Sequence, residues 1–337
     1  MKQKLAFLLL AVAALAAFTG LGIYRSSHPA DFGVFYAAGK IVAHGQGSSL
    51  YNWRLQDQVQ RSSTTLSSSR SYHRLAWQAL LFVPMSALPY RAAYVTWWIV
   101  SLLLAGLTLY VLRAEFHGIG SNGRLVFLAL LFVPMANCLD EGQDAVLVMM
   151  ALLFAARALE NEHDAQAGAL LALGATKFHL LLPLFALLLI KRRWRVLGTM
   201  AIGSAALLAV SVAVVGPTLL TDWIHAMQRT RHTTDQMYIA SGANVFASFA
   251  SFPRASMVLA AVIALLGLLL FREADRQMIH FGALYMVGVI TQPHSSYFDL
   301  VAGVFILVPP LLLRRRASKQ ARSSAPTTSP LPELQRA

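Results

Sequence analysis

Residues 165–190 read AQAGALLALGATKFHLLLPLFALLLI, and the basic cluster KRRWR follows directly at 191–195. This apolar run is longer than the roughly 20 residues with which a helix crosses a bilayer. Similar apolar runs recur along the chain, at 5–23 and at about 75–89, 92–113, 125–139, 143–159, 194–216, 255–271, 278–292 and 299–313. Together they predict an all-α integral membrane protein, a polytopic bundle of about ten transmembrane helices.

The composition agrees with a membrane location. Of the 337 residues, 57% are hydrophobic and only 13% are Asp, Glu, Lys or Arg, about half of the charged share of a soluble domain. The mean hydropathy is +0.56. These values exclude a cytosolic enzyme, a secreted disulfide scaffold, a disordered chain and a soluble nucleic-acid binder. The single cysteine, Cys138, also excludes an intrachain disulfide and a zinc site built from several cysteines.

The basic residues predict the orientation in the membrane. Clusters abut several apolar runs, at Lys2 and Lys4, at 191–195 and at 314–316. Such clusters mark the cytoplasmic ends of transmembrane helices. An even number of spans then places both termini in the cytoplasm and puts 24–74, 217–254 and 293–298 on the outer side. We predict a multi-pass protein of a bacterial-type inner (plasma) membrane. The net charge of +13 indicates membrane anchoring rather than a nucleic-acid partner.

Four regions follow from this pattern. Residues 1–23 form a first transmembrane helix, favoured over a cleaved signal peptide because the run is close to a full span. Residues 24–74 form an outer loop with amphipathic helices, which is too long for a connector and is expected to carry function. Residues 75–313 form the multi-helix membrane domain, and 314–337 form a basic, disordered cytoplasmic tail.

Lys177 and His179 lie in the middle of the 165–190 run. Ionisable residues inside a membrane are costly and are functional candidates. A lysine beside a histidine in a water-accessible cavity suits a phosphate group. Prolines in or beside several short spans, among them Pro84 and Pro134, indicate broken helices, which line such a cavity. The alternative is that Lys177 pairs with a carboxylate such as Asp144 and only holds two helices together.

The segment from Asp140 to Asp144, DEGQD, separates two short helices. Its ordinary interpretation is a helix junction with acidic residues at the start of the next helix. Strict counting places this break on the cytoplasmic side, so a catalytic role there requires a re-entrant hairpin. Under that condition Glu141, Gln143 and Asp144 are candidates for lining the site.

Asp31 follows the first helix, in the segment ADFGVFYAAGK at 30–40. An aspartate here caps a helix, and Phe32, Phe35 and Tyr36 at helical spacing predict an amphipathic helix on the membrane surface. A carboxylate at this place is also suited to take a proton from a hydroxyl acceptor that arrives from water. Asp57, further along the same loop, is the competing base.

His294, Tyr297 and Asp299 crowd the start of the final apolar run, on the predicted outer side. Interfacial anchoring is a common role for such tyrosines. The alternative is a lining for a sugar or a phosphate.

The order of these features resembles a known family. The residues on which the resemblance rests are Asp31-Phe32, Phe35-Tyr36-Ala37-Ala38, Gly45, Leu50-Tyr51, Phe82-Val83-Pro84, Trp97, Gly142-Gln143, the segment from Gly168 to Lys177, Arg192-Arg193-Trp194 and the segment from Pro293 to Asp299. In this order they resemble glycosyltransferase family 87, the polyprenyl-phosphate-sugar-dependent transferases. The resemblance covers about residues 25–313.

The resemblance implies a bundle like that of other GT-C transferases, with the active site open to the non-cytoplasmic face. It implies that an acidic residue in the first outer loop, here Asp31, acts as base and that the sugar carbon is inverted. The donor phosphate and sugar would be held by Lys177, His179, His294, Tyr297 and Asp299.

The predicted function is the transfer of a sugar, such as the hexose mannose, from a polyprenyl-phosphate donor to a hydroxyl of a lipid or glycan acceptor. No cofactor and no metal site are predicted, since protein cations can stabilise a monophosphate leaving group, although a divalent metal is compatible. The alternative is a secondary transporter or a flippase-like protein for lipid carriers, which also uses broken helices and buried charges. That alternative leaves the long loop 24–74 unexplained.

Overall fold

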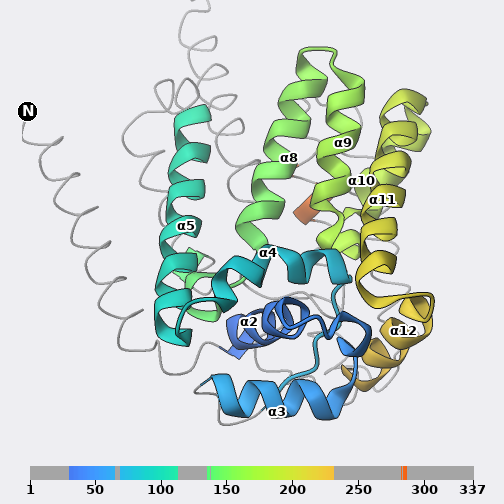
Figure 1. Ribbon diagram of the computed structural model, residues 1–337. Helices are drawn as coiled ribbons and strands as arrows, with labels where there is room; N and C mark the ends of the chain where they lie inside the picture. Colours follow the sequence, from blue (N-terminus) through green and yellow to red (C-terminus); the bar gives the residue numbers. More distant parts are fainter. Residues whose placement is uncertain are drawn as a thin grey trace, which may run out of the picture.

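The computed structural model describes residues 30–64, 69–112, 135–136, 138–230, 282 and 284–286. Every regular element in these residues is helical (Figure 1). The predicted first span at 1–23, the tail at 314–337, and His294, Tyr297 and Asp299 lie outside the described residues.

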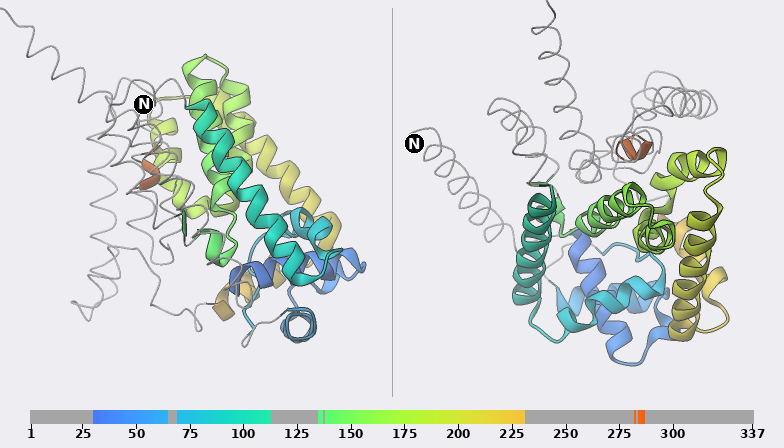
Figure 2. Two further views of the ribbon diagram at one scale, coloured as in Figure 1. Left: turned by 90° about the vertical axis from the view of Figure 1, so that its left-hand side faces the viewer. Right: turned by 90° about the horizontal axis from the view of Figure 1, so that it is seen from above.

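The described helices form two groups. One group is a bundle of five helices that run roughly along one direction: α5 (Tyr90–Val111), α8 (Ala145–Glu160), α9 (Asp164–Gly174), α10 (Phe178–Ile190) and α11 (Trp194–Val215). The other group lies across one end of this bundle: α2 (Ala30–Ala43), α3 (Trp53–Ser63) and α4 (Ala76–Ser86), with α12 (Leu219–Thr230) beside them (Figures 1 and 2). The short turns η1 (Gly47–Ser49) and η2 (Ala175–Lys177) lie at the same end, which we call the site end.

Two of the described helices, α5 and α11, are long and apolar enough to cross a membrane, with 22 residues each. At 1.5 Å per residue each is about 33 Å long, which matches the hydrocarbon core of a bilayer. Their outward faces carry large apolar side chains, of which Leu103 is 67% and Ile202 71% exposed. Water would disfavour such faces, whereas lipid solvates them.

The predicted single span at 165–190 is wrong, because the chain reverses within it. Gly168 of α9 approaches the backbone of Val196, and Ala172 approaches Gly203, so that α9 and α11 run in the same direction. Helix α10 therefore runs back between them. At the far end of this hairpin, Arg193 Nη2 lies 2.5 Å from Asp164 Oδ1. Lys177 thus lies at a helix break at the hairpin tip and not in the middle of a continuous helix.

The predicted span at 75–89 is also not formed. In its place α4 has only 11 residues, about half of what a bilayer requires, and it lies across the bundle end (Figure 1). Its N-terminus is held by Ser211 of α11, whose Oγ accepts a hydrogen bond from the Trp77 backbone N–H. Compared with the predicted arrangement, one pass of the chain along the bundle is therefore absent here, and one is added by the reversal within the α9–α10 hairpin.

Helix α2 differs from the amphipathic surface helix that its sequence predicts. Aromatic residues of other helices surround it, and Phe32 packs at 5.5 Å from Tyr94, ring centroid to centroid. Phe35 and Tyr36 are also buried. The helix is apolar on nearly all sides because it fills the space between α3, α4 and α5. By contrast, α3 is amphipathic and starts at Asn52, whose side chain accepts hydrogen bonds from two backbone N–H groups.

Candidate active site

Asp31 lies in the first turn of α2 and is held by two donors. Its Oδ1 accepts a hydrogen bond from Arg70 Nη1 at 3.1 Å, and its Oδ2 accepts one from Gln143 Nε2. The Asp31 side chain remains 23% exposed. The carboxylate is therefore oriented on both oxygens and still accessible to a substrate.

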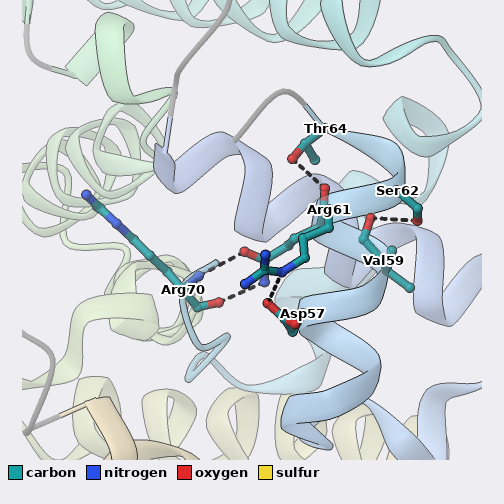
Figure 3. A network of polar contacts seen from close by, with 7 residues as sticks. Asp57, Val59, Arg61, Ser62, Thr64 and Arg70 are labelled. Atoms are coloured by element: carbon teal, nitrogen blue, oxygen red, sulfur yellow. Dashed lines mark hydrogen bonds and ion pairs between the residues drawn. The ribbon is translucent and has the colours of Figure 1, made fainter. Parts of the chain in front are cut away.

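Arg70 reaches Asp31 because buried glutamines of α3 hold its backbone. The Gln60 side chain donates to the Arg70 carbonyl at 2.8 Å and accepts from the Arg70 N–H at 2.9 Å. One helical turn earlier, Gln56 accepts from the Tyr72 N–H at 2.9 Å. Figure 3 shows Arg70 beside α3, with its side chain extending away from the helix. The side-chain amides of Gln56 and Gln60 thus hold the backbone of the segment that leads into α4.

Aromatic residues hold the break at 140–144 against α2. The indole N–H of Trp97 donates to the Gly142 carbonyl at 3.0 Å, and the Tyr94 hydroxyl donates to the Leu139 carbonyl at 2.9 Å. Gly142 has a φ of +65°, and a Cβ there would clash with Phe32. Only glycine allows this close approach at this backbone conformation. The break consequently lies at the site end, beside Asp31, and not at the opposite end where strict counting placed it.

Glu141 is the second carboxylate beside Asp31. Burial, followed by the negative charge of Asp31, raises the pKa of Glu141 to about 7. Its carboxylate also accepts a hydrogen bond from the Asp31 backbone N–H, which opposes this rise. Glu141 therefore caps the start of α2 and titrates near neutral pH.

Lys177 and Arg74 both lie near Asp144. Lys177 Nζ is 3.9 Å and Arg74 Nη2 is 3.7 Å from Asp144 Oδ1. Arg74 also donates through Nη1 to the Thr176 carbonyl at 3.1 Å, which joins it to the tip of the α9–α10 hairpin. The side chains of Lys177 and Asp144 are 3% and 6% exposed. Lys177 thus lies within ion-pair distance of Asp144, the carboxylate that the sequence analysis named as its alternative partner.

The structure brings together five of the predicted site residues: Asp31, Glu141, Gln143, Asp144 and Lys177. His179 lies at the start of α10, and the structure does not describe its side chain. Sequence analysis missed Arg70 and Arg74. Their only signal was a pair of arginines four residues apart in the outer loop.

The competing base Asp57 has a different environment. Hydrogen bonds from Ser69 and from Arg61 lower its pKa. Its Oδ1 accepts from Arg61 Nε at 2.8 Å within the same helix (Figure 3). This is an ordinary helical ion pair at spacing i, i+4. Asp57 therefore does not share the partners of Asp31.

Within the described residues, no three His, Cys, Asp or Glu side chains converge in a way that could hold a metal ion. The prediction that no metal is required stays a prediction.

The long apolar helices and the charged residues gathered at one end of the bundle define a membrane protein with a polar site. Residues 77–293, about two thirds of the chain, match the model of glycosyltransferase family 87. The chain belongs to glycosyltransferase family 87, as the resemblance predicted, and is a membrane glycosyltransferase. No curated protein and no solved structure matches it. The matched range contains the break at 140–144 and Lys177, whereas Asp31, Arg70 and Arg74 precede it.

Proposed function

We propose that this glycosyltransferase moves a sugar, a hexose such as mannose, from a polyprenyl-phosphate donor to a hydroxyl of a lipid or glycan acceptor on the non-cytoplasmic face. One observation carries the proposal. Gln143 and Asp144 are consecutive residues. Gln143 binds Asp31, and Asp144 lies within 4 Å of both Arg74 and Lys177. Since consecutive Cα atoms are about 3.8 Å apart, the backbone at 143–144 links the candidate base to two cations, Arg74 and Lys177.

The chemistry follows from these groups. The acceptor oxygen attacks the anomeric carbon from the face opposite the phosphate, and its proton passes to the Asp31 carboxylate. The bond between the anomeric carbon and the phosphate oxygen breaks, and its electron pair stays on that oxygen. Lys177 stabilises the negative charge that develops there. Attack from the opposite face inverts the configuration of the sugar carbon.

Each oxygen of Asp31 already has a donor, Arg70 or Gln143, and these donors orient the carboxylate. Orientation of a base toward its proton lowers the entropic part of the barrier. We further propose that His179, His294, Tyr297 and Asp299 contribute to binding of the donor phosphate and sugar. The apolar outer faces of α5 and α11 offer surface for the polyprenyl chain and for lipid. No cofactor is required.

The test is an assay in proteoliposomes with a radiolabelled polyprenyl-phosphate sugar. We expect the label to move to an extractable acceptor lipid or glycan. Lys177→Ala is expected to lose most of this transfer while accumulating in the membrane, and Lys177→Arg to recover only part, because a planar guanidinium does not replace a compact ammonium. Lys191→Ala, at the opposite end, serves as control. Substrate counterflow without transfer would instead support the alternative, a transporter or a flippase-like protein.

A further inference from the structure

We propose that Arg74 is a second phosphate-binding cation and that Asp144 occupies the phosphate position until the donor displaces it. This inference rests on the proposed function, since it assigns the ligands of the donor phosphate at the same site. It adds Arg74, which precedes the residues matched by the family model, and it gives Asp144 a role other than joining two helices.

The distances support a placeholder rather than a structural ion pair. A charge-assisted hydrogen bond between nitrogen and a carboxylate oxygen is about 2.7–2.9 Å long. Asp144 Oδ1 lies 3.7 Å from Arg74 and 3.9 Å from Lys177. Within the described residues, this buried oxygen has no hydrogen-bond partner. The carboxylate therefore lies near both cations without bonding to either.

The charges near this oxygen suit a phosphodiester. Arg74 and Lys177 carry one positive charge each, and both lie within 4 Å of Asp144 Oδ1. A polyprenyl-phosphate sugar is a phosphodiester with one negative charge. Buried charges are stable only when they are paired, so a phosphate that displaces Asp144 would meet both cations in the same place. The side chains of Arg74 and Lys177 are 14% and 3% exposed, which limits compensation by water.

Arg74 is also positioned for this role. One arm of its guanidinium donates to the Thr176 carbonyl at 3.1 Å, so the group is fixed to the turn that carries Lys177. The other arm faces Asp144. A planar guanidinium can bind two oxygens of one phosphate, whereas the ammonium acts as a point charge. Arg74 would orient the phosphate, and Lys177 would meet the charge that develops on the leaving oxygen.

The experiment measures binding of a polyprenyl monophosphate, without sugar, to the purified protein in nanodiscs. Arg74→Gln is expected to weaken binding by about tenfold or more, the loss of a charge-assisted contact. Asp144→Asn is expected to tighten binding several-fold, because it removes the competing carboxylate and keeps the side-chain shape. Arg195→Gln, exposed at the opposite end of α10 and α11, should leave the affinity unchanged.

The Asp144→Asn result decides the question, because impaired folding cannot tighten binding. Unchanged or weaker binding by Asp144→Asn would overturn the placeholder role, and unchanged binding by Arg74→Gln would overturn the role of Arg74. Inorganic phosphate should compete with the lipid more strongly in Asp144→Asn than in the wild-type protein. Failure of the wild-type protein to bind the lipid or to transfer sugar would contradict the proposed function itself. If the wild-type protein transfers sugar but Arg74→Gln does not weaken binding and Asp144→Asn does not tighten it, only this inference is contradicted.

Discussion

Asp31 and Asp57 belong to the same predicted outer loop, but their hydrogen-bond partners differ. Asp31 is bound by side chains from two distant parts of the chain. Asp57 is bound within its own helix and by Ser69. A carboxylate whose orientation depends on several elements can be held for a reaction, whereas an exposed ion pair within one helix supports mainly that helix.

We expect Asp31→Asn to lower sugar-transfer turnover by roughly 10²–10⁴-fold, the usual effect of losing a general base. The amide occupies the same space and keeps some of the hydrogen bonds, so donor binding and folding should be nearly unchanged. Asp57→Asn serves as the matched control and should retain activity. Near wild-type turnover in Asp31→Asn would reduce Asp31 to a cap of α2 and leave Asp57 and Glu141 to be tested as base.

The raised pKa of Glu141 predicts how the stability of the folded protein depends on pH. Its pKa is about 7 in the folded protein and 4.5 as the unperturbed value. Because this pKa is raised, the folded state holds its proton more tightly, and stability falls as the pH rises from about 4.5 to 7. The shift corresponds to at most about 3 kcal/mol. In detergent, Glu141→Gln should be more stable than wild type at pH 8 and similar at pH 4.5. Asp31, Arg70, Asp140 and Tyr90 also face Glu141 and are left intact.

A melting temperature for Glu141→Gln that tracks the wild-type protein at every pH would contradict this assignment. Asp164→Asn offers a control, because that carboxylate pairs with Arg193 at the opposite end of the bundle.

At the scale of helices, α9 and α11 approach closely through small residues, as is common between membrane helices. A Cβ at Gly168 would clash with the backbone oxygen of Val196, whereas a Cβ at Gly198 would meet no atom of the described residues within 4 Å. Gly168→Ala should therefore destabilise the protein by about 1–3 kcal/mol, the usual cost of overpacking. Gly198→Ala should be neutral or slightly stabilising, because alanine favours a helix. Thermal unfolding of the two purified variants checks the contrast. Equal melting temperatures would argue against this packing.

The α9–α10 hairpin can be tested by cross-linking. Asp164 and Arg193 are in contact across its open end, whereas in one continuous helix they would be about 43 Å apart. In a Cys138→Ser background, cysteines at 164 and 193 should be joined by a short bifunctional maleimide. Cysteines at 164 and 48, which lie at opposite ends of the bundle, should not. A failure of the first pair to cross-link would restore the single-span interpretation.

At the scale of the whole molecule, the two ends of the bundle have different chemistry. The site end joins distant segments, since the Trp223 indole donates to the His73 carbonyl at 2.8 Å and Gly47 approaches Val214. The opposite end carries the turn at 161–163 and the basic cluster at 191–195. The described parts of the segments predicted to face outward, 30–64, 69–74 and 217–230, thus lie at the opposite end from the cluster predicted to face the cytoplasm. The side of the membrane that each end faces stays a prediction.

We expect a membrane-impermeant maleimide to label a cysteine at Ser48 in intact cells, and other positions within 45–70, because the site end faces outward. A cysteine at Glu162 and positions within 318–335 should react only after the cells are opened. Substitution of an acidic residue such as Glu162 has little influence on orientation. The reverse pattern of labelling would place the active site on the cytoplasmic side.

The sequence alone determined the properties that depend on local composition. Apolar runs predicted a helical membrane protein, basic clusters predicted which segments share an end, and the ordered motifs indicated glycosyltransferase family 87, which the family model confirms. Asp31 and Lys177 were found because a polar residue next to or inside an apolar run has a cost that composition reveals.

The tertiary structure decided the direction of the chain and the long-range pairs. Hydropathy is the same for one span of 26 residues and for two short helices that reverse at Lys177, so only the packing of α9 against α11 distinguishes them. The pass of the chain missing at 75–89 and the reversal added at Lys177 cancel in their effect on chain direction. The basic cluster at 191–195 therefore still lies at the end of the bundle opposite Asp31. Arg70 and Arg74 were missed because their roles depend on partners far along the chain. Asp31 and Gln143 are 112 positions apart, and Arg74 and Thr176 are 102 apart. No local pattern encodes such a pairing, since it forms only when α2, α4, α8 and the hairpin meet.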